Sequence, residues 1–309
     1  MQKVVQAVRQ NSRLTTRELS SQLAISRSSI WRMLKERKFK IFKATPVQKL
    51  FPEDKERRFC FSRWFMEQLN NQATLPVDIM YSDESTFYLH PPRGLPHNKV
   101  WATENPRECI VHHTQYNPRV NVWCAIHGRT VLGPIFCSNK MNGRDYLQLL
   151  KGTLGPYIDN MPLVQRGRFY FQQDGAPIHT AKPVTQWLDE NLPFQWIGLK
   201  ASIKWPPRSP DLTPLDFFFW SFLKNKVYSR KPETLDELKL FILEECQGMD
   251  GDMLKRVCNN TVKRNTACFN TSGDVFENNI WINVLLVLRC FDALRSALEA
   301  WHFSHGVVL

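Results

Sequence analysis

The sequence predicts an α/β protein in two parts: a small all-α unit, followed by a larger unit built on a mixed β-sheet with flanking helices. Three observations support this prediction. Helical and basic patterning fills roughly the first 40 residues, and strand patterning dominates residues 77–136. Beyond these strands, helical and strand patterns alternate along the chain, which favours a sheet that is covered on both faces.

Three short helices are expected within residues 1–45, which form the first domain. Thr15 or Thr16 can cap the second helix, and Ser26 lies in the turn before a third helix over residues 27–38. The order helix, helix, turn, helix is typical of a helix-turn-helix DNA-binding unit. The alternative is an ordinary three-helix bundle with a solvated basic face.

In a helix-turn-helix unit the third helix enters the DNA major groove, and side chains near its start reach base edges and phosphates. The candidates for these contacts are Ser26, Arg27, Ser28, Ser29, Arg32 and Lys35. The charge balance agrees, because 41 Lys and Arg residues outnumber 29 Asp and Glu residues and give a net charge of +12. This excess favours a polyanionic partner such as nucleic acid.

A linker and one helix are expected over residues 46–75, and a larger domain over residues 76–278. The first strand of this domain is expected to end near Asp83, and the next two strand patterns pair as a hairpin. Three antiparallel strands, a helix, and then strands alternating with helices make the ribonuclease-H-like arrangement. Residues 279–309 form an atypical tail, which fits either an amphipathic helix or sequence beyond an original stop.

Three aspartates stand where acidic side chains can converge. Asp83 and Asp174 each close a predicted strand, and Asp216 takes the third position of a helix that Thr213 would cap. Strands that end side by side bring their terminal carboxylates into one site. Mg²⁺ prefers oxygen ligands, and two such ions can promote displacement at a phosphodiester. The three residues therefore predict a metal-dependent nuclease site.

Each of these aspartates also has a structural interpretation. Asp83 could be a turn residue, and Asp174 precedes Gly175 in a dipeptide that is common in turns. Asp216 could be only a favourable charge at a helix start.

Three further residues are secondary candidates. Asp211 competes with Asp216 as the third ligand, but it lies in a Ser-Pro-Asp turn before the helix and is interpreted as structural. His179 could contact a phosphate or cap its own loop. Glu84 is expected to point away from the site, because adjacent strand residues face opposite sides.

Four motifs resemble those of the mariner-type DNA transposases of the Tc/mariner superfamily. In chain order they are Ser82-Asp83-Glu84-Ser85-Thr86-Phe87, Val120-Asn121-Val122-Trp123-Cys124, residues 172–179 and residues 205–218. The resemblance covers about residues 10–278. It implies that Asp83, Asp174 and Asp216 form the catalytic and metal-binding triad.

The same resemblance implies an enzyme that binds terminal inverted repeats of double-stranded DNA and catalyses strand cleavage and strand transfer into target DNA. Its cofactor would be Mg²⁺ or Mn²⁺, with two ions in each active site. The 41 residues between Asp174 and Asp216 resemble a branch of the family with three aspartates and a long second spacing. Because family members usually carry two helix-turn-helix units and this one resembles the second, an N-terminally shortened copy is expected.

Partners and location follow partly from the resemblance. The Pro-rich segment 90–106 resembles the loop that reaches a partner subunit, which implies a homodimer. No membrane segment is expected, because charges interrupt the apolar stretch 280–301. The eight cysteines show no zinc-ligand spacing and are interpreted as reduced thiols, which agrees with a nuclear location.

Two other functions remain open. One is a transposase-derived, sequence-specific DNA-binding protein without transposition activity; the intact aspartates argue against it, and the single helix-turn-helix unit argues for it. The other is a host ribonuclease-H-like nuclease that cuts hybrids without preference for repeat ends, and the helix-turn-helix unit argues against this function.

Overall fold

The computed structural model describes residues 2–11, 14–39, 48–90 and 117–277. The chain divides into two compact units, Met1–Pro46 and Val47–Leu309. The expected tail over residues 279–309 and nearly all of the Pro-rich segment lie outside the described residues. No helix within the described ranges is long and apolar enough to cross a membrane.

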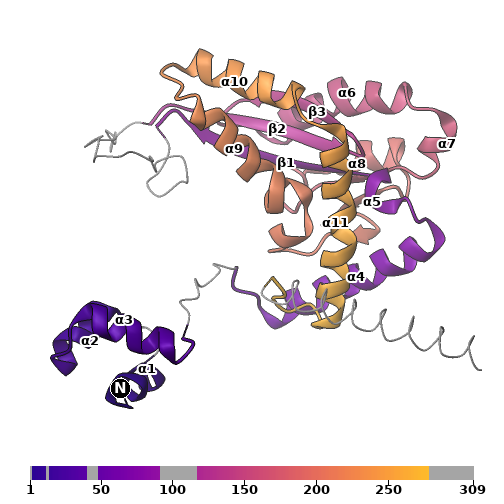
Figure 1. The fold of residues 1–309 in the computed structure, drawn as a ribbon. Helices are drawn as coiled ribbons and strands as arrows, with labels where there is room; N and C mark the ends of the chain where they lie inside the picture. The colour runs from indigo at the N-terminus through magenta and orange to yellow at the C-terminus, as the bar shows by residue number, and fades with distance from the viewer. Residues whose placement is uncertain (1, 12–13, 40–47, 91–116, 278–309) are drawn as a thin grey trace, which may run out of the picture. The chain divides into compact units, whose positions relative to one another are not determined.

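The first unit contains three helices, α1 (Gln2–Gln10), α2 (Thr16–Leu23) and α3 (Arg27–Glu36) (Figure 1). One fully buried residue from each helix forms the core: Val4, Leu19 and Ile30. Thr15 caps α2, because its hydroxyl accepts the N–H of Glu18 while the Glu18 carboxylate accepts the N–H of Thr15. The predicted order of helix, helix, turn and helix is confirmed.

The second unit begins with two helices and a three-stranded antiparallel meander, and then alternates helices with short strands. Its elements up to the fourth strand are α4 (Pro52–Asn71), α5 (Leu75–Asp78), β1 (Ile79–Tyr88), β2 (Arg119–His127), β3 (Thr130–Cys137), α6 (Gly143–Asp159), α7 (Leu163–Arg166) and β4 (Tyr170–Gln172). The remaining elements are α8 (Lys182–Asn191), β5 (Trp196–Gly198), β6 (Ile203–Lys204), η2 (Pro210–Leu212), η3 (Leu215–Phe219), α9 (Trp220–Ser229), α10 (Leu235–Gln247) and α11 (Gly251–Asn270).

The six strands form one mixed sheet in the order β3-β2-β1-β4-β5-β6. β1 is a central strand, antiparallel to β2 and parallel to β4. The parallel pairing with β4 is short, running from Ile79 opposite Tyr170 to Tyr81 opposite Gln172, whereas β2 pairs with β1 along nearly its whole length. Beyond Tyr81, one edge of β1 is therefore free of strand pairing.

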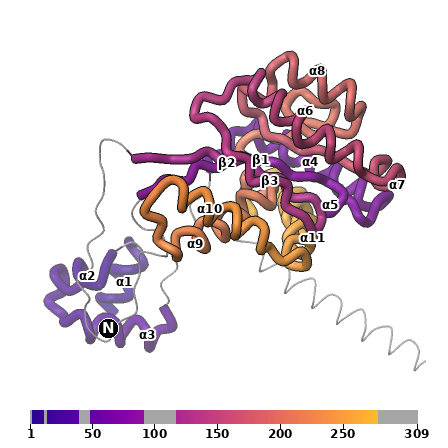
Figure 2. Tube along the Cα trace, turned by 90° about the horizontal axis from the view of Figure 1, so that it is seen from above, coloured from indigo at the N-terminus to yellow at the C-terminus, as the bar shows by residue number. Residues whose placement is uncertain are grey.

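Helices cover both faces of the sheet, because alternate strand residues are apolar and point to opposite sides. On one face, Met80 and Trp123 pack with residues of α6 and α8. On the other face, Tyr81 and Cys124 pack with residues of α4, α9, α10 and α11. Figure 2 shows β1, β2 and β3 between α6 and α8 on one side and α9 and α10 on the other. The predicted mixed sheet with helices on both faces is confirmed.

Three features differ from the expectation: the length of β1, the presence of β6 and the packing of α4. β1 continues to Tyr88, so Asp83 lies within the strand rather than at its end, because β2 keeps pairing beyond it. The segment that follows β5 contributes the short strand β6. α4, expected in a separate linker segment, packs within the second unit, where Phe59 stacks on Phe269 of α11 with ring centroids 4.9 Å apart.

Candidate active site

The sheet places Asp83, within β1, and Asp174, just after the end of β4, at matching positions beyond the parallel pairing of these two strands. The last pair between β1 and β4 is Tyr81 opposite Gln172, and each aspartate stands two residues beyond its member of that pair. Both carboxylates therefore lie at the edge of the sheet where the parallel strands end, which is where open α/β sheets bind ligands.

Asp216 comes from η3, a single π-helical turn that leads directly into α9. Such turns are found frequently at functional sites. Thr213 does not cap this helix as the sequence predicts. Its hydroxyl is buried and has no hydrogen-bond partner in the described part of the chain, and Pro214 immediately precedes the turn.

Asp83, Asp174 and Asp216 line one pocket with a volume of ≈ 460 Å³. The rest of the lining comes mainly from β1, the end of β4 and the loop between β6 and η3, and it includes Gln172 and Arg208. The structure thus brings together the three aspartates that the sequence singles out. Their catalytic and metal-binding roles remain predictions.

The carboxylates of this pocket repel one another, and this repulsion adds to the effect of burial on their pKa values. Burial, followed by the charge of Asp216, raises the pKa of Asp83 well above its ordinary value. Asp216 is accessible from the pocket, yet the protein atoms around it desolvate its carboxylate. That desolvation, followed by the charge of Asp174, raises the pKa of Asp216 to about 6. The pocket therefore concentrates negative charge that a bound cation would neutralise.

Two residues of α9 face the first aspartate. The indole Nε1–H of Trp220 donates a hydrogen bond of 2.6 Å to Asp83 Oδ2. Lys224 is half-buried with its Nζ 5.3 Å from the centroid of the Phe87 ring, and burial lowers its pKa despite the charges of Asp83 and Asp216. Trp220 and Lys224 are absent from the sequence-predicted site. Their spacing of four and eight residues after Asp216 is the signal of a shared helix face.

His179 holds the second aspartate in place. Its Nδ1 lies 2.6 Å from Asp174 Oδ1, and its Nε2 lies 3.1 Å from Glu84 Oε1. Although burial lowers the pKa of His179, the hydrogen bonds to Asp174 and Glu84 raise it to about 10, so both ring nitrogens donate. Burial raises the pKa of Asp174, but His179 and the N–H of Ala176 hold it below its ordinary value.

This arrangement changes the expectations for two of the three secondary candidates, Glu84 and His179. Glu84 does not point away from the site; it lines the pocket, because the loop that carries His179 folds back over β1. His179 is 2% exposed and uses both nitrogens within the protein. It orients Asp174, and its geometry offers no donor for a phosphate.

The donor set fits hard divalent cations. Carboxylate oxygens are the ligands that Mg²⁺ prefers, and two buried polar atoms near them, Gln172 Oε1 and Thr213 Oγ1, have no partner in the described part of the chain. Both residues line the pocket, so either atom can bond to water around a cation. Within the described ranges, no three His, Cys, Asp or Glu side chains are yet placed so that they could hold one metal ion together. Trp220 and His179 hold two of the carboxylates, which must rotate to share a cation.

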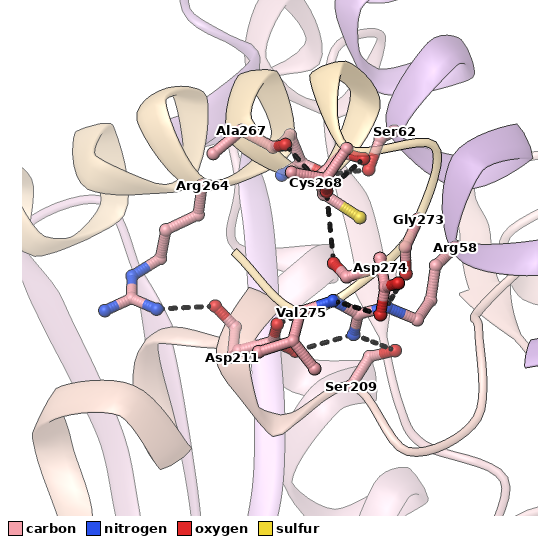
Figure 3. A network of polar contacts seen from close by, with 12 residues as sticks. Arg58, Ser62, Ser209, Asp211, Arg264, Ala267, Cys268, Gly273, Asp274 and Val275 are labelled. Atoms are coloured by element: carbon pink, nitrogen blue, oxygen red, sulfur yellow. Dashed lines mark hydrogen bonds and ion pairs between the residues drawn. The ribbon is translucent and has the colours of Figure 1, made fainter. Parts of the chain in front are cut away.

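Asp211, the competing third ligand, serves a different purpose in the structure (Figure 3). Its carboxylate accepts two hydrogen bonds from the guanidinium of Arg58, of 2.7 and 2.6 Å, and Arg58 is only 1% exposed. Arg264 also donates to the backbone oxygen of Asp211 at 2.8 Å. Asp211 is not part of the pocket lining. It fastens the loop before Asp216 to α4 and α11.

The rest of the Arg58 network ties three segments together. Arg58 Nε donates to the carbonyl of Gly273 at 2.8 Å, and its Nη1 donates to Ser209 Oγ at 2.9 Å. Gly273 lies in the turn after α11 with a φ of +80°, and a side chain there would overlap the carbonyl oxygen of Lys55. α4 and the end of α11 therefore form the support on which the loop before Asp216 rests.

The candidate DNA-contact residues lie on α3 or at its cap. The hydroxyl of Ser26 accepts the N–H of Ser29, and this bond caps the helix. The other four candidates are exposed: Arg27, Ser28, Arg32 and Lys35. Trp31 is absent from the sequence-predicted set and is 55% exposed. Lys35 Nζ lies 5.0 Å from the centroid of its ring.

Two family models match the chain. A model described as a DDE superfamily endonuclease matches residues 78–239, a range that begins at β1 and contains all three aspartates of the pocket. A model described as a winged helix-turn-helix DNA-binding domain matches residues 2–36, which span α1 to α3.

Several known proteins are similar to this chain. The transposable element Tc3 transposase of Caenorhabditis elegans is 27% identical over 270 residues, which cover 85% of this chain and 76% of that protein. The Tcb2 transposase of Caenorhabditis briggsae is 28% identical over 48% of this chain and 51% of its own length. A crystal structure of the Mos1 mariner paired end complex with Mn has a TM-score of 0.72 at 18% identity, and covers 90% of this chain and 80% of that chain.

The fold similarity confirms the predicted ribonuclease-H-like arrangement, and the relatives confirm the resemblance to mariner-type transposases. Because the endonuclease model spans more than half of the chain, the protein belongs to the DDE superfamily of endonucleases, with a helix-turn-helix unit ahead of the endonuclease region.

Proposed function

We propose that this protein is a cut-and-paste DNA transposase of the Tc/mariner type. Its helix-turn-helix unit binds terminal inverted repeats, and its second unit cleaves the DNA and joins it to a target. The observation that carries the proposal is the single pocket lined by Asp83, Asp174 and Asp216, within the range that matches the endonuclease family. The transposase relatives support the substrate and the reaction.

The residues of the pocket suit a metal-dependent phosphodiester displacement. We propose that Asp83 and Asp174 share two Mg²⁺ or Mn²⁺ ions and that Asp216 completes the second ion's site. Bound cations would lower the pKa of the attacking hydroxyl and neutralise charge on the phosphate. Trp220 and His179 orient the first two carboxylates, so the protein contributes position and charge rather than its own acid–base chemistry.

The reaction proceeds in two displacements at phosphorus. In the first, water forms the new P–O bond and the 3′ oxygen of the neighbouring nucleotide leaves, which frees a 3′ hydroxyl at the element end. In the second, that hydroxyl attacks a phosphodiester of target DNA, and the target strand's own 3′ oxygen leaves. The first step converts one phosphodiester into a 5′ phosphate and a 3′ hydroxyl, with a proton of the water ending on the leaving 3′ oxygen. The second step exchanges one phosphodiester for another, the proton of the attacking hydroxyl being replaced by one on the leaving 3′ oxygen. Neither step needs an oxidant or a reductant.

Two features of the cell biology follow from this reaction. We propose that two copies of the chain act as a homodimer, because one element has two ends to cut. The structurally similar Mos1 transposase forms a paired-end complex. We also propose a nuclear location, because the substrate is chromosomal DNA. Sedimentation of the protein with and without end DNA tests the dimer, and imaging of a tagged chain tests the location.

The proposed function is tested by cation-dependent cleavage of a duplex that carries the terminal repeat flanking the gene. We expect cleavage at the repeat end in Mg²⁺ or Mn²⁺, and joining to a target plasmid when a recessed 3′ hydroxyl is supplied. Asp174→Ala should bind the duplex as the parent does and cut nothing. A folded parent that binds the repeat but neither cuts nor joins it would overturn the proposal in favour of a DNA-binding protein.

A further inference from the structure

The loop between β6 and η3 forms one wall of the active-site pocket, and it contains a strained basic residue. Arg208 has a φ of +53°, in the left-handed region that residues other than glycine rarely adopt. Such a conformation costs about 1–3 kcal/mol and persists where the surrounding structure enforces it. Here Arg58 and Asp211 hold the loop just after Arg208. In this conformation Arg208 lines the pocket.

Two contacts anchor the Arg208 guanidinium. Its Nη1 donates to Asp54 Oδ2 at 2.7 Å, and the Asp54 side chain is only 5% exposed. Its Cζ lies 4.7 Å from the centroid of the Phe51 ring, which Lys49 also approaches at 5.5 Å. The guanidinium is thereby fixed at one edge and on one face, so little conformational entropy is lost when it binds a ligand.

The anchored guanidinium keeps binding capacity. Its side chain is 44% exposed, and its Nε and Nη2 have no hydrogen-bond partner within the described residues. A second polar group on the same loop also lacks a partner there. The hydroxyl of Thr213 is buried, with the residue 5% exposed, and it belongs to the same pocket lining. A buried hydroxyl without a partner is costly, which points to a ligand that satisfies it.

The charge of the pocket indicates what that ligand is. Four carboxylates line it, those of Asp83, Glu84, Asp174 and Asp216, and Arg208 is the one basic residue on the lining within the described residues. The phosphates of a DNA strand that enters this acidic pocket are repelled by the carboxylates. Cations held at the carboxylates offset this repulsion only for the phosphate next to them, not for the neighbouring phosphates. A fixed guanidinium offsets that repulsion and presents parallel N–H groups that match a phosphate.

We propose that Arg208 and Thr213 bind a backbone phosphate of the DNA strand that occupies the pocket, next to the phosphate that is cut. This inference rests on the proposed function, because it assigns a position on the same substrate. Arg208 is a positioning residue: it sets the register of the strand against the three aspartates, and Asp54 and Phe51 set the position of Arg208.

The first test measures how DNA affinity depends on salt. The full-length parent and Arg208→Gln are titrated onto the repeat-end duplex at several KCl concentrations, with Ca²⁺ present and a gel run to establish that no strand is cut. Loss of one phosphate contact should reduce the slope of log K against log[KCl] by about 0.9. Arg230→Gln is the matched control, since Arg230 pairs with Glu244 away from the pocket, and its slope should equal the parent's.

Two further variants separate the contact from a structural effect. Arg208→Lys keeps the charge, so its salt slope should stay near the parent's while its affinity falls. Thr213→Val keeps the shape and loses the hydroxyl, so affinity should fall roughly tenfold with the slope unchanged. If Arg208→Gln fails to fold, as judged by circular dichroism, Asp54→Asn carries the test together with Arg208→Lys. Asp54→Asn frees the guanidinium but keeps its charge, so its affinity should fall while its slope stays near the parent's, and unchanged affinity in both variants overturns the inference.

The second test locates the phosphate. Neutral methylphosphonate replaces each phosphate of the strand in turn, and one position near the cut should weaken binding to the parent but not to Arg208→Gln. An unchanged salt slope in Arg208→Gln, or equal sensitivity of parent and variant at every position, overturns the inference. Failure of the proposed function looks different, because the parent would then bind the duplex without cutting it in Mg²⁺, whatever the slopes.

Discussion

Asp211→Ala should destabilise the second unit strongly, because it leaves a buried cation without its counterion. The Arg58 side chain is 1% exposed and its two terminal nitrogens bond to Asp211 at 2.7 and 2.6 Å. Removal of one partner from a buried ion pair typically costs about 3–5 kcal/mol. Arg58 would retain the Gly273 carbonyl and the Ser209 hydroxyl, and the partly exposed gap would admit water. We therefore expect about 3 kcal/mol.

Urea unfolding of the full-length protein, followed by tryptophan fluorescence, measures this loss. Asp274→Asn is the matched control: its ion pair with Lys55 is 39% and 49% exposed, and such surface pairs are worth about 0–1 kcal/mol. Arg58→Met combined with Asp211→Leu should recover most of the stability, because no charge remains buried. A loss below about 1 kcal/mol in Asp211→Ala, together with weaker Mn²⁺ binding, would refute this reasoning and make Asp211 a ligand.

Four other substitutions, of which the two glycine variants form a matched pair, test separate parts of the structure by the same unfolding measurement. Asp216→Asn should abolish cleavage while leaving the unfolding free energy at pH 7 equal or higher, because the raised pKa of Asp216 means that the folded pocket disfavours its charge; a clear loss of stability would contradict this. Gly273→Ala should cost at least about 1 kcal/mol at its φ of +80°, whereas Gly152→Ala, in open space within α6, should gain about 0.5–1 kcal/mol; equal effects would refute the conformational argument. Thr15→Ala should cost the first unit about 1 kcal/mol through its lost cap and leave the second unit's transition unchanged.

The sequence predicts most of the fold because its periodicities are local. The polar residues that precede the second and third predicted helices mark the starts of α2 and α3, and the strand patterns of β2 and β3 pair as the predicted hairpin. β1 is longer than predicted because its second half depends on pairing with β2, across a segment of some 30 residues. The short β6 has only two residues, too few to show a period.

The site is less predictable, because its orientation depends on residues distant in the sequence. Strand ends and motif order single out Asp83, Asp174 and Asp216, and the structure brings them to one pocket. The orientation of Glu84 could not be read from strand alternation, since a loop 95 residues away carries the His179 that it contacts. The ion pair of Arg58 with Asp211 spans 153 residues and leaves no local pattern.

The most direct test of the central claim replaces each of Asp83, Asp174 and Asp216 by cysteine in turn and compares cleavage in Mg²⁺ and Mn²⁺. Thiolate sulfur is a poor ligand for Mg²⁺ and a better one for softer ions. We predict that all three variants are inactive in Mg²⁺ and regain activity in Mn²⁺, whereas the three alanine variants stay inactive in both. If Mn²⁺ restores none of the cysteine variants, or restores the alanine variants equally, these aspartates do not hold the catalytic cations.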